Sequence, residues 1–366
     1  MAAILHEVVP MAQLSRGESR REGLRDDDAP VAPAARPAPA LLANLAVQDW
    51  FLLGYFALLT LALVFGTGPN RVASLERVGF DVALLVTGLV LTRGGVLRRG
   101  TLLHGLVYRV AIFASLQLSY FQLREILPAV SSRSVDAEIL AFDLRVFGYE
   151  PAIAWDRFVN PSTTEWFAFF YFSYFFLLVA HVVPMMLADK NGKRLAHFAL
   201  GAFFVFCCGH LGYIVVPGYG PYRHLAGQFD HALDGGLFWR LVLATVEAGG
   251  AQKDIFPSLH TAAPTFFAVF SFIHRRSLPF RYTWPIVGFA ATQIIVATMF
   301  LRWHWVVDVI AGFALATTAA LVSERIVRWE WARRARLGLH PVFEALAWPA
   351  PPVVEAKSGP RAGHSA

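Results

Sequence analysis

The stretch "DIFPSLHTAAPTFFAVFSF" runs from Asp254 to Phe272. Its second half is a continuous apolar segment of the kind that forms a membrane-spanning helix. Its first half places Pro257, Ser258 and His260 at the start of that helix. Because Ser is a favourable N-cap residue, we expect a helix that begins near Ser258, with a histidine at the mouth of a hydrophobic span.

The composition of the whole chain indicates a membrane protein. Of the 366 residues, 56% are hydrophobic and 16% are charged, whereas soluble domains carry about 25% charged residues. The net charge of +6 does not indicate a nucleic-acid partner, because the basic residues fall in short patches between apolar segments. Cys207 and Cys208 are adjacent within an apolar segment, which supports neither a disulfide framework nor a zinc site.

Eight apolar segments predict an all-α, polytopic membrane helix bundle. A helix needs about 20 residues to cross a bilayer, and the second segment is the shortest of the eight. The predicted spans are 46–66, 79–92, 101–123, 163–187, 195–216, 260–274, 282–301 and 304–322. Within this organisation, residues 46–100 contain two accessory spans and residues 101–322 contain the other six.

The segments outside the spans have their own signatures. Residues 1–45 are charged and then rich in Ala and Pro, which predicts a disordered cytoplasmic tail. Residues 134–158 have apolar residues at helical spacing with charges between them, which predicts interfacial helices; a surface helix and a substrate gate both fit this pattern. Residues 323–366 predict a basic helix against the cytoplasmic leaflet, followed by a second disordered tail.

The distribution of Lys and Arg predicts the topology. Cytoplasmic loops are richer in these residues than outer loops. The segments 92–100, 189–197 and 274–282 each hold three Lys or Arg in nine residues, whereas the longer segment 217–259 also holds only three. Eight spans with this alternation place both termini in the cytoplasm and His260 at the non-cytoplasmic face.

His304 and Asp308 are candidates for chemistry at that same face. They are four residues apart, so on a helix they share one side. A charge inside an apolar span is costly and indicates a functional site. An Asp that binds one imidazole nitrogen leaves the other free as a nucleophile or base. The alternative is a structural His–Asp pair that ties two helices together.

Five further residues are candidate phosphate ligands or acids. The N-terminus of a helix attracts phosphate, so a helix capped by Ser258 would hold an anion where His260 can protonate a leaving oxygen; a capping Ser with an interfacial His is the alternative. Arg223 follows a Gly/Pro-rich loop, and its guanidinium can bind phosphate oxygens in pairs. Arg302 is a second cation, or else a snorkelling interfacial side chain, and Lys253 is a third.

Three motifs, taken in order, resemble those of the type-2 phosphatidic-acid phosphatase superfamily. They are "VPGYGPYR" at 216–223, "FPSLH" at 256–260 and "RWHWVVD" at 302–308. The Pro-Ser-Leu-His form, where other members have Pro-Ser-Gly-His, is similar to the branch that contains inositol phosphorylceramide synthases, as is the upstream segment "FDLRVFGYEP". The resemblance covers roughly 134–320.

The resemblance implies a six-helix phosphatase-like core and a phosphohistidine mechanism that uses no metal and no other cofactor. His304 would attack phosphorus and Asp308 would orient it. His260 would protonate the leaving group and then activate the acceptor. The phosphate ligands would be Arg223, Ser258 and Arg302. Two positions depart from the family pattern, because Val216 stands where the first motif has a Lys and Thr298 where the third has an Arg.

These patterns together predict an integral-membrane lipid phosphatase or head-group phosphotransferase that acts at the outer membrane face. The substrate would be a membrane lipid phosphate or phosphodiester. A phosphohistidine discharged to water gives a phosphatase, and one discharged to a polyol or lipid hydroxyl gives a transferase. Three outer-loop acids, Asp230, Asp234 and Glu247, could bind polyol hydroxyls. The alternative is a non-catalytic transporter or scaffold, since buried ionisable residues also mark transporters. Against it, the spans show no pair of Gly/Pro-interrupted segments at corresponding positions of two sequence halves.

Overall fold

The computed structural model describes residues 41–249 and 253–346. The chain divides into two units, Met1–Ala35 and Arg36–Ala366, and every described residue belongs to the second. The predicted tails at 1–40 and 347–366 therefore lie outside the described residues. Within the predicted N-terminal tail, Leu41–Asn44 forms the short helix α1.

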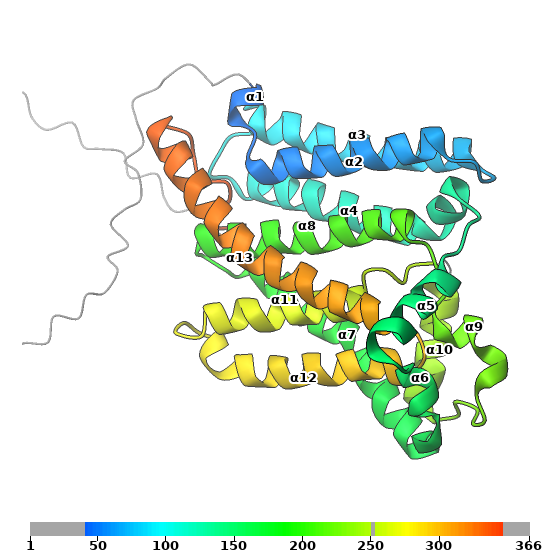
Figure 1. Cartoon of the computed structure of the whole chain (residues 1–366). Helices are drawn as coiled ribbons and strands as arrows, with labels where there is room; N and C mark the ends of the chain where they lie inside the picture. The colour runs from blue at the N-terminus through cyan, green and yellow to red at the C-terminus, as the bar shows by residue number, and fades with distance from the viewer. Residues whose placement is uncertain (1–40, 250–252, 347–366) are drawn as a thin grey trace, which may run out of the picture. The chain divides into compact units, whose positions relative to one another are not determined.

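The predicted all-α membrane bundle is confirmed, because the described residues form helices and turns and no strand. The eight predicted spans correspond to α2 (Val47–Phe65), α3 (Arg71–Arg93), α4 (Leu102–Val130), α7 (Pro161–Leu187), α8 (Gly192–Val215), α11 (Leu259–Ile273), α12 (Phe280–Phe300) and α13 (Val306–Arg336). These long helices run roughly side by side (Figure 1). Six of them, all but α3 and α11, are long and apolar enough to cross a membrane, which indicates a multi-pass membrane protein.

Two helices extend well beyond the predicted spans. Helix α3 begins at Arg71 and not near residue 79, because its first two turns are polar but still helical. Helix α13 continues through the basic segment to Arg336 as a single helix. No Gly or Pro interrupts residues 313–337, and the helix ends just before Gly338, whose φ of +64° is readily adopted by glycine. Both helices thus extend beyond the apolar residues from which the spans were predicted.

Short helices gather at one end of the bundle (Figure 1). The predicted interfacial segment 134–158 forms α5 (Asp136–Phe147), α6 (Pro151–Ala154) and a 3₁₀ turn at Asp156–Phe158. The break after α5 follows from Gly148, whose φ is +78°, and from Pro151 at the start of α6. Helices α9 (Pro221–His224) and α10 (Leu237–Gly249) lie at the same end.

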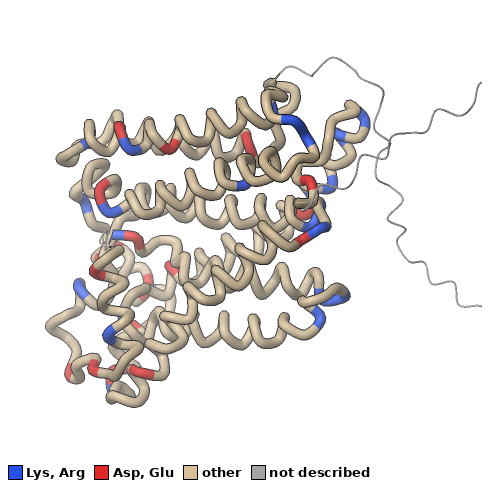
Figure 2. Tube along the Cα trace, turned by 180° about the vertical axis from the view of Figure 1, so that it is seen from behind, with Lys and Arg blue, Asp and Glu red and all other residues tan. Residues whose placement is uncertain are grey.

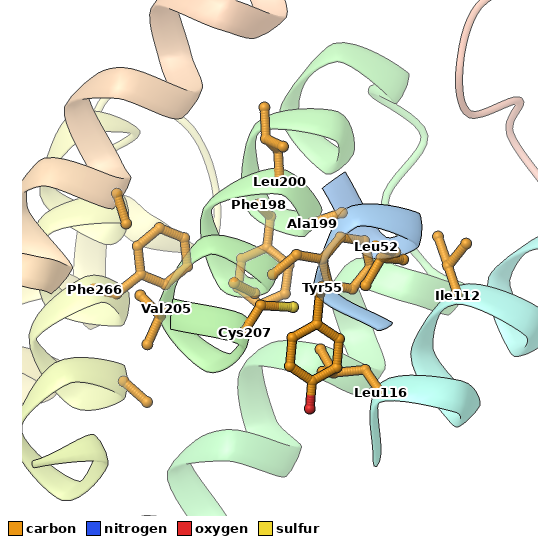
Figure 3. Packing of buried hydrophobic residues seen from close by; sticks show 14 of the residues in the cluster. Leu52, Tyr55, Ile112, Leu116, Phe198, Ala199, Leu200, Val205, Cys207 and Phe266 are labelled. Atoms are coloured by element: carbon orange, nitrogen blue, oxygen red, sulfur yellow. The ribbon is translucent and has the colours of Figure 1, made fainter. Parts of the chain in front are cut away.

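Helix α8 lies at the centre of the hydrophobic core. It packs against α2 and α4 on one side and against α11 and α13 on another. Figure 3 shows Phe198 and Val205 of α8 between Leu52 of α2 and Phe266 of α11, and all four side chains are fully buried. This central helix leads directly into the Gly/Pro-rich loop of the first motif, so the core fixes where that loop begins.

Charged residues are distributed unequally between the two ends of the bundle (Figure 2). Lys and Arg gather at the end where α1 and the last turn of α13 lie. Most of the Asp and Glu lie at the opposite end, together with the short helices. This asymmetry follows the distribution of basic loops along the sequence.

Candidate active site

The loop between α12 and α13 holds His304 in place through backbone hydrogen bonds. The carbonyl of Thr298 accepts the N–H groups of Trp303 and His304, at 2.9 and 3.2 Å. The chain then turns into α13, and His304 Nδ1 lies 3.5 Å from Asp308 Oδ2. Both side chains are buried, with 5% and 0% of their surface exposed. The predicted His–Asp pair therefore exists as a close, buried contact.

Two carboxylates cap the first turn of α13. Asp308 Oδ2 accepts the backbone N–H of Trp305 at 2.9 Å, and Asp143 Oδ2 from α5 accepts that of Val306 at 2.8 Å. An acidic group at this position is favoured by the positive end of the helix dipole. The cap fixes the orientation of the Asp308 carboxylate, so the oxygen nearest His304 is held in position.

His260 lies at the start of α11, as predicted. Ser258 is the N-cap of this helix, and its Oγ accepts the N–H of Thr261 at 3.2 Å. The ring of His260 stacks on Tyr171, with 4.2 Å between centroids and an interplanar angle of 11°. The ring of Tyr174 also contacts the His260 ring, with 4.3 Å between centroids and the two planes tilted. Two aromatic side chains of α7 thus hold the orientation of the His260 imidazole.

The two predicted histidines face one cavity. Their ring centroids are 6.4 Å apart, with an interplanar angle of 44°, and both line a cavity of about 240 Å³, which we call the histidine cavity. Half of its other lining residues are aromatic. They include Tyr120 and Phe121 of α4, Tyr171, Tyr174 and Phe175 of α7, Tyr213 of α8, Tyr219 and Tyr222 of the first motif, and Trp303. The Nε2 of His260 is buried and has no hydrogen-bond partner among the described residues.

Asp136 joins the first and third motifs. Its carboxylate accepts the N–H groups of Tyr219 and Gly220, each at 2.8 Å, and the indole N–H of Trp305 at 3.0 Å. Gly220 has a φ of +85°, and a Cβ at this position would lie 2.3 Å from the carbonyl oxygen of Trp303. The loop therefore requires glycine there for both conformation and space.

The predicted phosphate ligands Arg223 and Lys253 both lie near Tyr219, which lines the histidine cavity. The exposed guanidinium of Arg223 is 3.9 Å from the Tyr219 ring centroid, and the Lys253 Nζ is 5.5 Å from it. Lys253 is buried and donates to the carbonyls of Ser131 and Arg133, at 3.1 and 3.0 Å. Neither cation lines the cavity itself, and neither does Ser258.

The structure places Arg302, the remaining predicted ligand, in an ion pair outside the cavity lining. Its Nη2 donates to Asp156 Oδ1 at 2.6 Å and to the carbonyl of His231 at 2.7 Å. Burial alone would raise the pKa of Asp156, but hydrogen bonds from His231 and the backbone, together with Arg302, bring it below its ordinary value. Arg302 therefore has the contacts of a structural residue that anchors the 3₁₀ turn to the third motif.

Burial sets the charge state of His304. It lowers the pKa of the imidazole from 6.5 to about 4, although the nearby Asp254 and a backbone hydrogen bond with Ile255 act in the opposite direction. Burial likewise raises the pKa of Asp254, and His304 partly offsets that rise. At neutral pH the His304 ring is therefore neutral, which is the protonation state that a nucleophile requires.

Two charged residues that line the cavity are absent from the sequence-based prediction. Asp254 lies two residues before "FPSLH", and Arg124 lies nearly two turns before the end of α4. Arg124 was missed because the predicted third span ends at residue 123. The three outer-loop acids proposed for polyol binding, Asp230, Asp234 and Glu247, do not line the cavity. Within the described residues, no group of three or more His, Cys, Asp or Glu side chains could hold a metal ion.

Comparison with known proteins bears on the same region. A family model described as the PAP2 superfamily matches residues 137–322, which is half of the chain. The chain belongs to the PAP2 superfamily. The comparison with curated proteins gave no match, and the comparison with solved structures gave none either.

The PAP2 match runs from the start of α5 into α13, so it contains the predicted catalytic residues His260, His304 and Asp308. PAP2 proteins are generally phosphatases or phosphotransferases. The structure also locates the two departures from the PAP2 motif pattern. Val216 caps the C-terminal end of α8, and Thr298 is fully buried beneath the His304 loop, where its carbonyl binds the backbone.

Proposed function

We propose that this protein is an integral-membrane lipid phosphatase or head-group phosphotransferase that forms a phosphohistidine on His304. The observation that carries the proposal is the pair of histidines across one cavity, with 6.4 Å between the ring centroids and a buried carboxylate behind His304. Both rings line the same cavity, so a phosphoryl group held there can contact a nitrogen of each.

In the proposed first half-reaction, the neutral His304 nitrogen attacks phosphorus and the P–O bond to the leaving group breaks. His260 donates a proton to the departing oxygen. Asp308 holds the tautomer of His304 and stabilises the cation that forms on it. The phosphate would be bound at the first turn of α11, where Leu259 and His260 line the cavity and Ser258 acts as the cap. Arg223 would reach it from beside Tyr219, outside the cavity lining. Arg302 and Lys253 would support the site through their structural contacts.

In the proposed second half-reaction, His260 removes a proton from an acceptor, whose oxygen then attacks the phosphohistidine. Water as acceptor gives a phosphatase. A polyol or lipid hydroxyl gives a transferase of the kind found in the branch that contains inositol phosphorylceramide synthases. Asp254 and the tyrosine hydroxyl groups of the histidine cavity support an acceptor that carries several hydroxyl groups, because they offer both hydrogen-bond donors and acceptors there.

The proposal is tested with purified protein and radiolabelled lipids. We expect turnover of a lipid phosphate or phosphodiester that is lost in His304→Ala. Parallel reactions with and without inositol, and with and without ceramide, separate the two outcomes. A labelled product that forms without an added acceptor, which is free phosphate from a phosphomonoester or a phosphomonoester from a phosphodiester, indicates hydrolysis. A labelled product that forms only when the acceptor is added indicates a transferase. Wild-type protein that inserts correctly but turns over none of these substrates would favour a transporter or scaffold.

The proposed topology has both termini in the cytoplasm and the histidine cavity at the non-cytoplasmic face, and accessible cysteines test it. In a background where Cys207 and Cys208 are replaced by Ala, Gly227→Cys should react with a membrane-impermeant thiol reagent in intact cells. A Cβ at Gly227 meets no atom within 4 Å, so this variant is sterically tolerated. Lys190→Cys, at the opposite end of the bundle, should react only after permeabilisation. The reverse labelling pattern would place the histidine cavity at the cytoplasmic face and contradict the proposed topology.

A further inference from the structure

A second cavity lies near the middle of the spanning helices. It has a volume of about 160 Å³ and lies between α4, α7 and α8. Apolar side chains form most of its wall, among them Leu116 of α4, Leu178 and Val182 of α7, and Phe203 of α8. We call it the apolar cavity.

The apolar cavity adjoins the histidine cavity. Four aromatic residues line both: Tyr120, Phe121, Tyr174 and Phe175. Tyr174 also packs against the ring of His260, at 4.3 Å between centroids. The two cavities therefore share a wall, with His260 and His304 on one side and, on the other, mainly apolar side chains together with Gln117 and His210.

The side of the apolar cavity between α4 and α7 is weakly closed. Helix α4 packs along α3, and α7 packs along α12, but α4 and α7 do not form a packed pair with each other. Phe121, on the wall shared by both cavities, is 61% exposed. The inner side, by contrast, is closed by His210 of α8, which stacks on Tyr120 and contacts the Tyr55 hydroxyl at 3.1 Å.

We infer that the apolar cavity binds a hydrocarbon tail of the lipid whose phosphate lies between His260 and His304, and that the tail enters between α4 and α7. This inference rests on the proposed function. Four of its lining residues, Gln117, Tyr120, Tyr174 and His210, carry polar groups, but the other nine are Leu, Val, Ala or Phe, so a hydrocarbon occupant finds more partners there than a polar one. An empty cavity of this kind forfeits dispersion contacts on all sides, so the abundant hydrocarbon of a membrane is the occupant that its chemistry fits.

The tail would position the phosphate and contribute little to affinity. A tail that leaves the bilayer for the cavity exchanges one apolar environment for another, so the hydrophobic effect contributes little. The depth of the tail, however, fixes how far the head group reaches toward His304. A misplacement of about 1 Å at a reacting centre can cost on the order of a hundredfold in rate.

Filling the cavity tests this inference. We compare Val182→Trp, which adds bulk inside the cavity, with Val183→Trp, whose side chain is 44% exposed on the outer surface of the same helix. The readout is the ratio of kcat/KM for dipalmitoyl to that for dioctanoyl phosphatidic acid. Val182→Trp should lower this ratio by at least about tenfold, since only the longer tail meets the obstruction. Val183→Trp should leave it unchanged. An unchanged ratio in both would overturn the inference.

A second pair covers the case in which Val182→Trp does not fold. Leu178→Phe adds less bulk to the same cavity, and Val179→Phe is its exposed neighbour. The ratio should fall in the first and stay constant in the second, and equal ratios would count against the tail site.

Cross-linking tests the site without turnover. Wild-type protein in vesicles is irradiated with a palmitoyl phosphatidic acid that carries a diazirine at the tail end. Labels should map to the cavity faces of α4, α7 and α8, and labels confined to outward-facing residues such as Phe289 of α12 would overturn the inference. Protein that turns over no lipid phosphate but carries labels in the cavity would refute the proposed function and leave the tail site standing.

Discussion

The backbone N–H of Ser258 donates to the carbonyl oxygen of Asp308 at 3.0 Å. This bond joins the cap of α11 to the first turn of α13, so the two helices that carry the histidines are fixed to each other at their ends. Gly312, one turn further along α13, allows this approach. A Cβ at Gly312 would lie 2.5 Å from the Ser258 carbonyl oxygen. The spacing between His260 and His304 therefore depends on a glycine that neither histidine touches.

The first prediction concerns this contact. Gly312→Ala should lower both turnover and thermal stability in detergent, because overpacking at a close contact costs about 1–3 kcal/mol. Gly288→Ala, on α12, is the matched control, since a Cβ there meets no atom within 4 Å. It should be neutral or slightly stabilising, because Ala favours a helix over Gly by about 1 kcal/mol. Equal behaviour of the two variants would show that the contact does not position the site.

The second prediction concerns Asp136. Asp136→Ala leaves the Tyr219 and Gly220 N–H groups and the Trp305 indole without their acceptor. Hydrogen bonds to a charged group contribute about 1.5–3 kcal/mol each, so unfolding should occur at a lower temperature and turnover should fall by on the order of a hundredfold as the loop moves.

Glu138→Ala is the control for Asp136→Ala. Glu138 lies on the same helix and forms an exposed ion pair with Arg133 at 3.2 Å. Such pairs contribute at most about 1 kcal/mol, so both readouts should stay near wild type. Asp136→Ala protein with wild-type activity would contradict the assigned role of this carboxylate.

The third prediction separates Arg223 from Lys253. Arg223→Ala should cost more activity, because an arginine acts on the charge that develops in the transition state. Lys253→Ala should instead lower stability by about 1–3 kcal/mol, because the Ser131 and Arg133 carbonyls lose their donor. Steady-state kinetics and thermal unfolding of each variant distinguish the two effects. Small, equal losses of activity in both would mean that the phosphate is held elsewhere.

Arg302→Ala extends this comparison. Because Arg302 pairs with the buried carboxylate of Asp156, its removal should destabilise the protein by about 3–5 kcal/mol. A variant with normal stability and greatly reduced turnover would show instead that Arg302 binds phosphate, which is the role that the motif resemblance implied.

The sequence predicted a long helix at each of the eight spans, and six of these helices are long and apolar enough to cross a membrane. These six were predictable because a bilayer imposes a length and a composition on a spanning helix. The contact of His304 with Asp308 was also predicted, but from helical spacing, whereas His304 lies in the loop just before α13 and its backbone bond to Thr298 holds it near the first turn. The contributions of Asp136 and Asp143 were not, because each carboxylate contacts a loop or helix end far along the chain. The contacts of Arg302 were equally unpredictable, since they depend on Asp156 in a separate segment.

The fourth prediction concerns pH. The pKa of His304 lies near 4 in the folded protein, below its ordinary 6.5. The neutral nucleophile is therefore present above about pH 4 and is lost as pH falls through that value. The acidic limb of kcat/KM should lie near pH 4, measured with a phosphodiester because a phosphomonoester itself titrates near pH 6. A limb near pH 6.5 would indicate a nucleophile that titrates like an exposed imidazole.

The fifth prediction tests the proposed roles of His304 as the nucleophile and His260 as the general acid. His304→Ala should be inactive on every substrate. His260→Ala should retain relatively more activity on an activated aryl phosphate than on a lipid phosphate, because only a poor leaving group needs the proton, an effect of about 10²–10⁴-fold. Asp308→Asn should fall between, since it keeps the shape of the side chain but misorients the imidazole. Equal losses of His260→Ala on both substrates would argue against its role as the acid.

The most direct test is to trap the phosphoenzyme. Wild-type protein is mixed with a lipid substrate labelled with ³²P at the transferred phosphoryl group and is quenched within the first turnover. The label should be stable to base, labile to acid and located by mass spectrometry on His304, and it should be absent from His304→Ala. Acid-labile label that persists in His304→Ala, or label on another residue of the wild-type protein, would contradict the account.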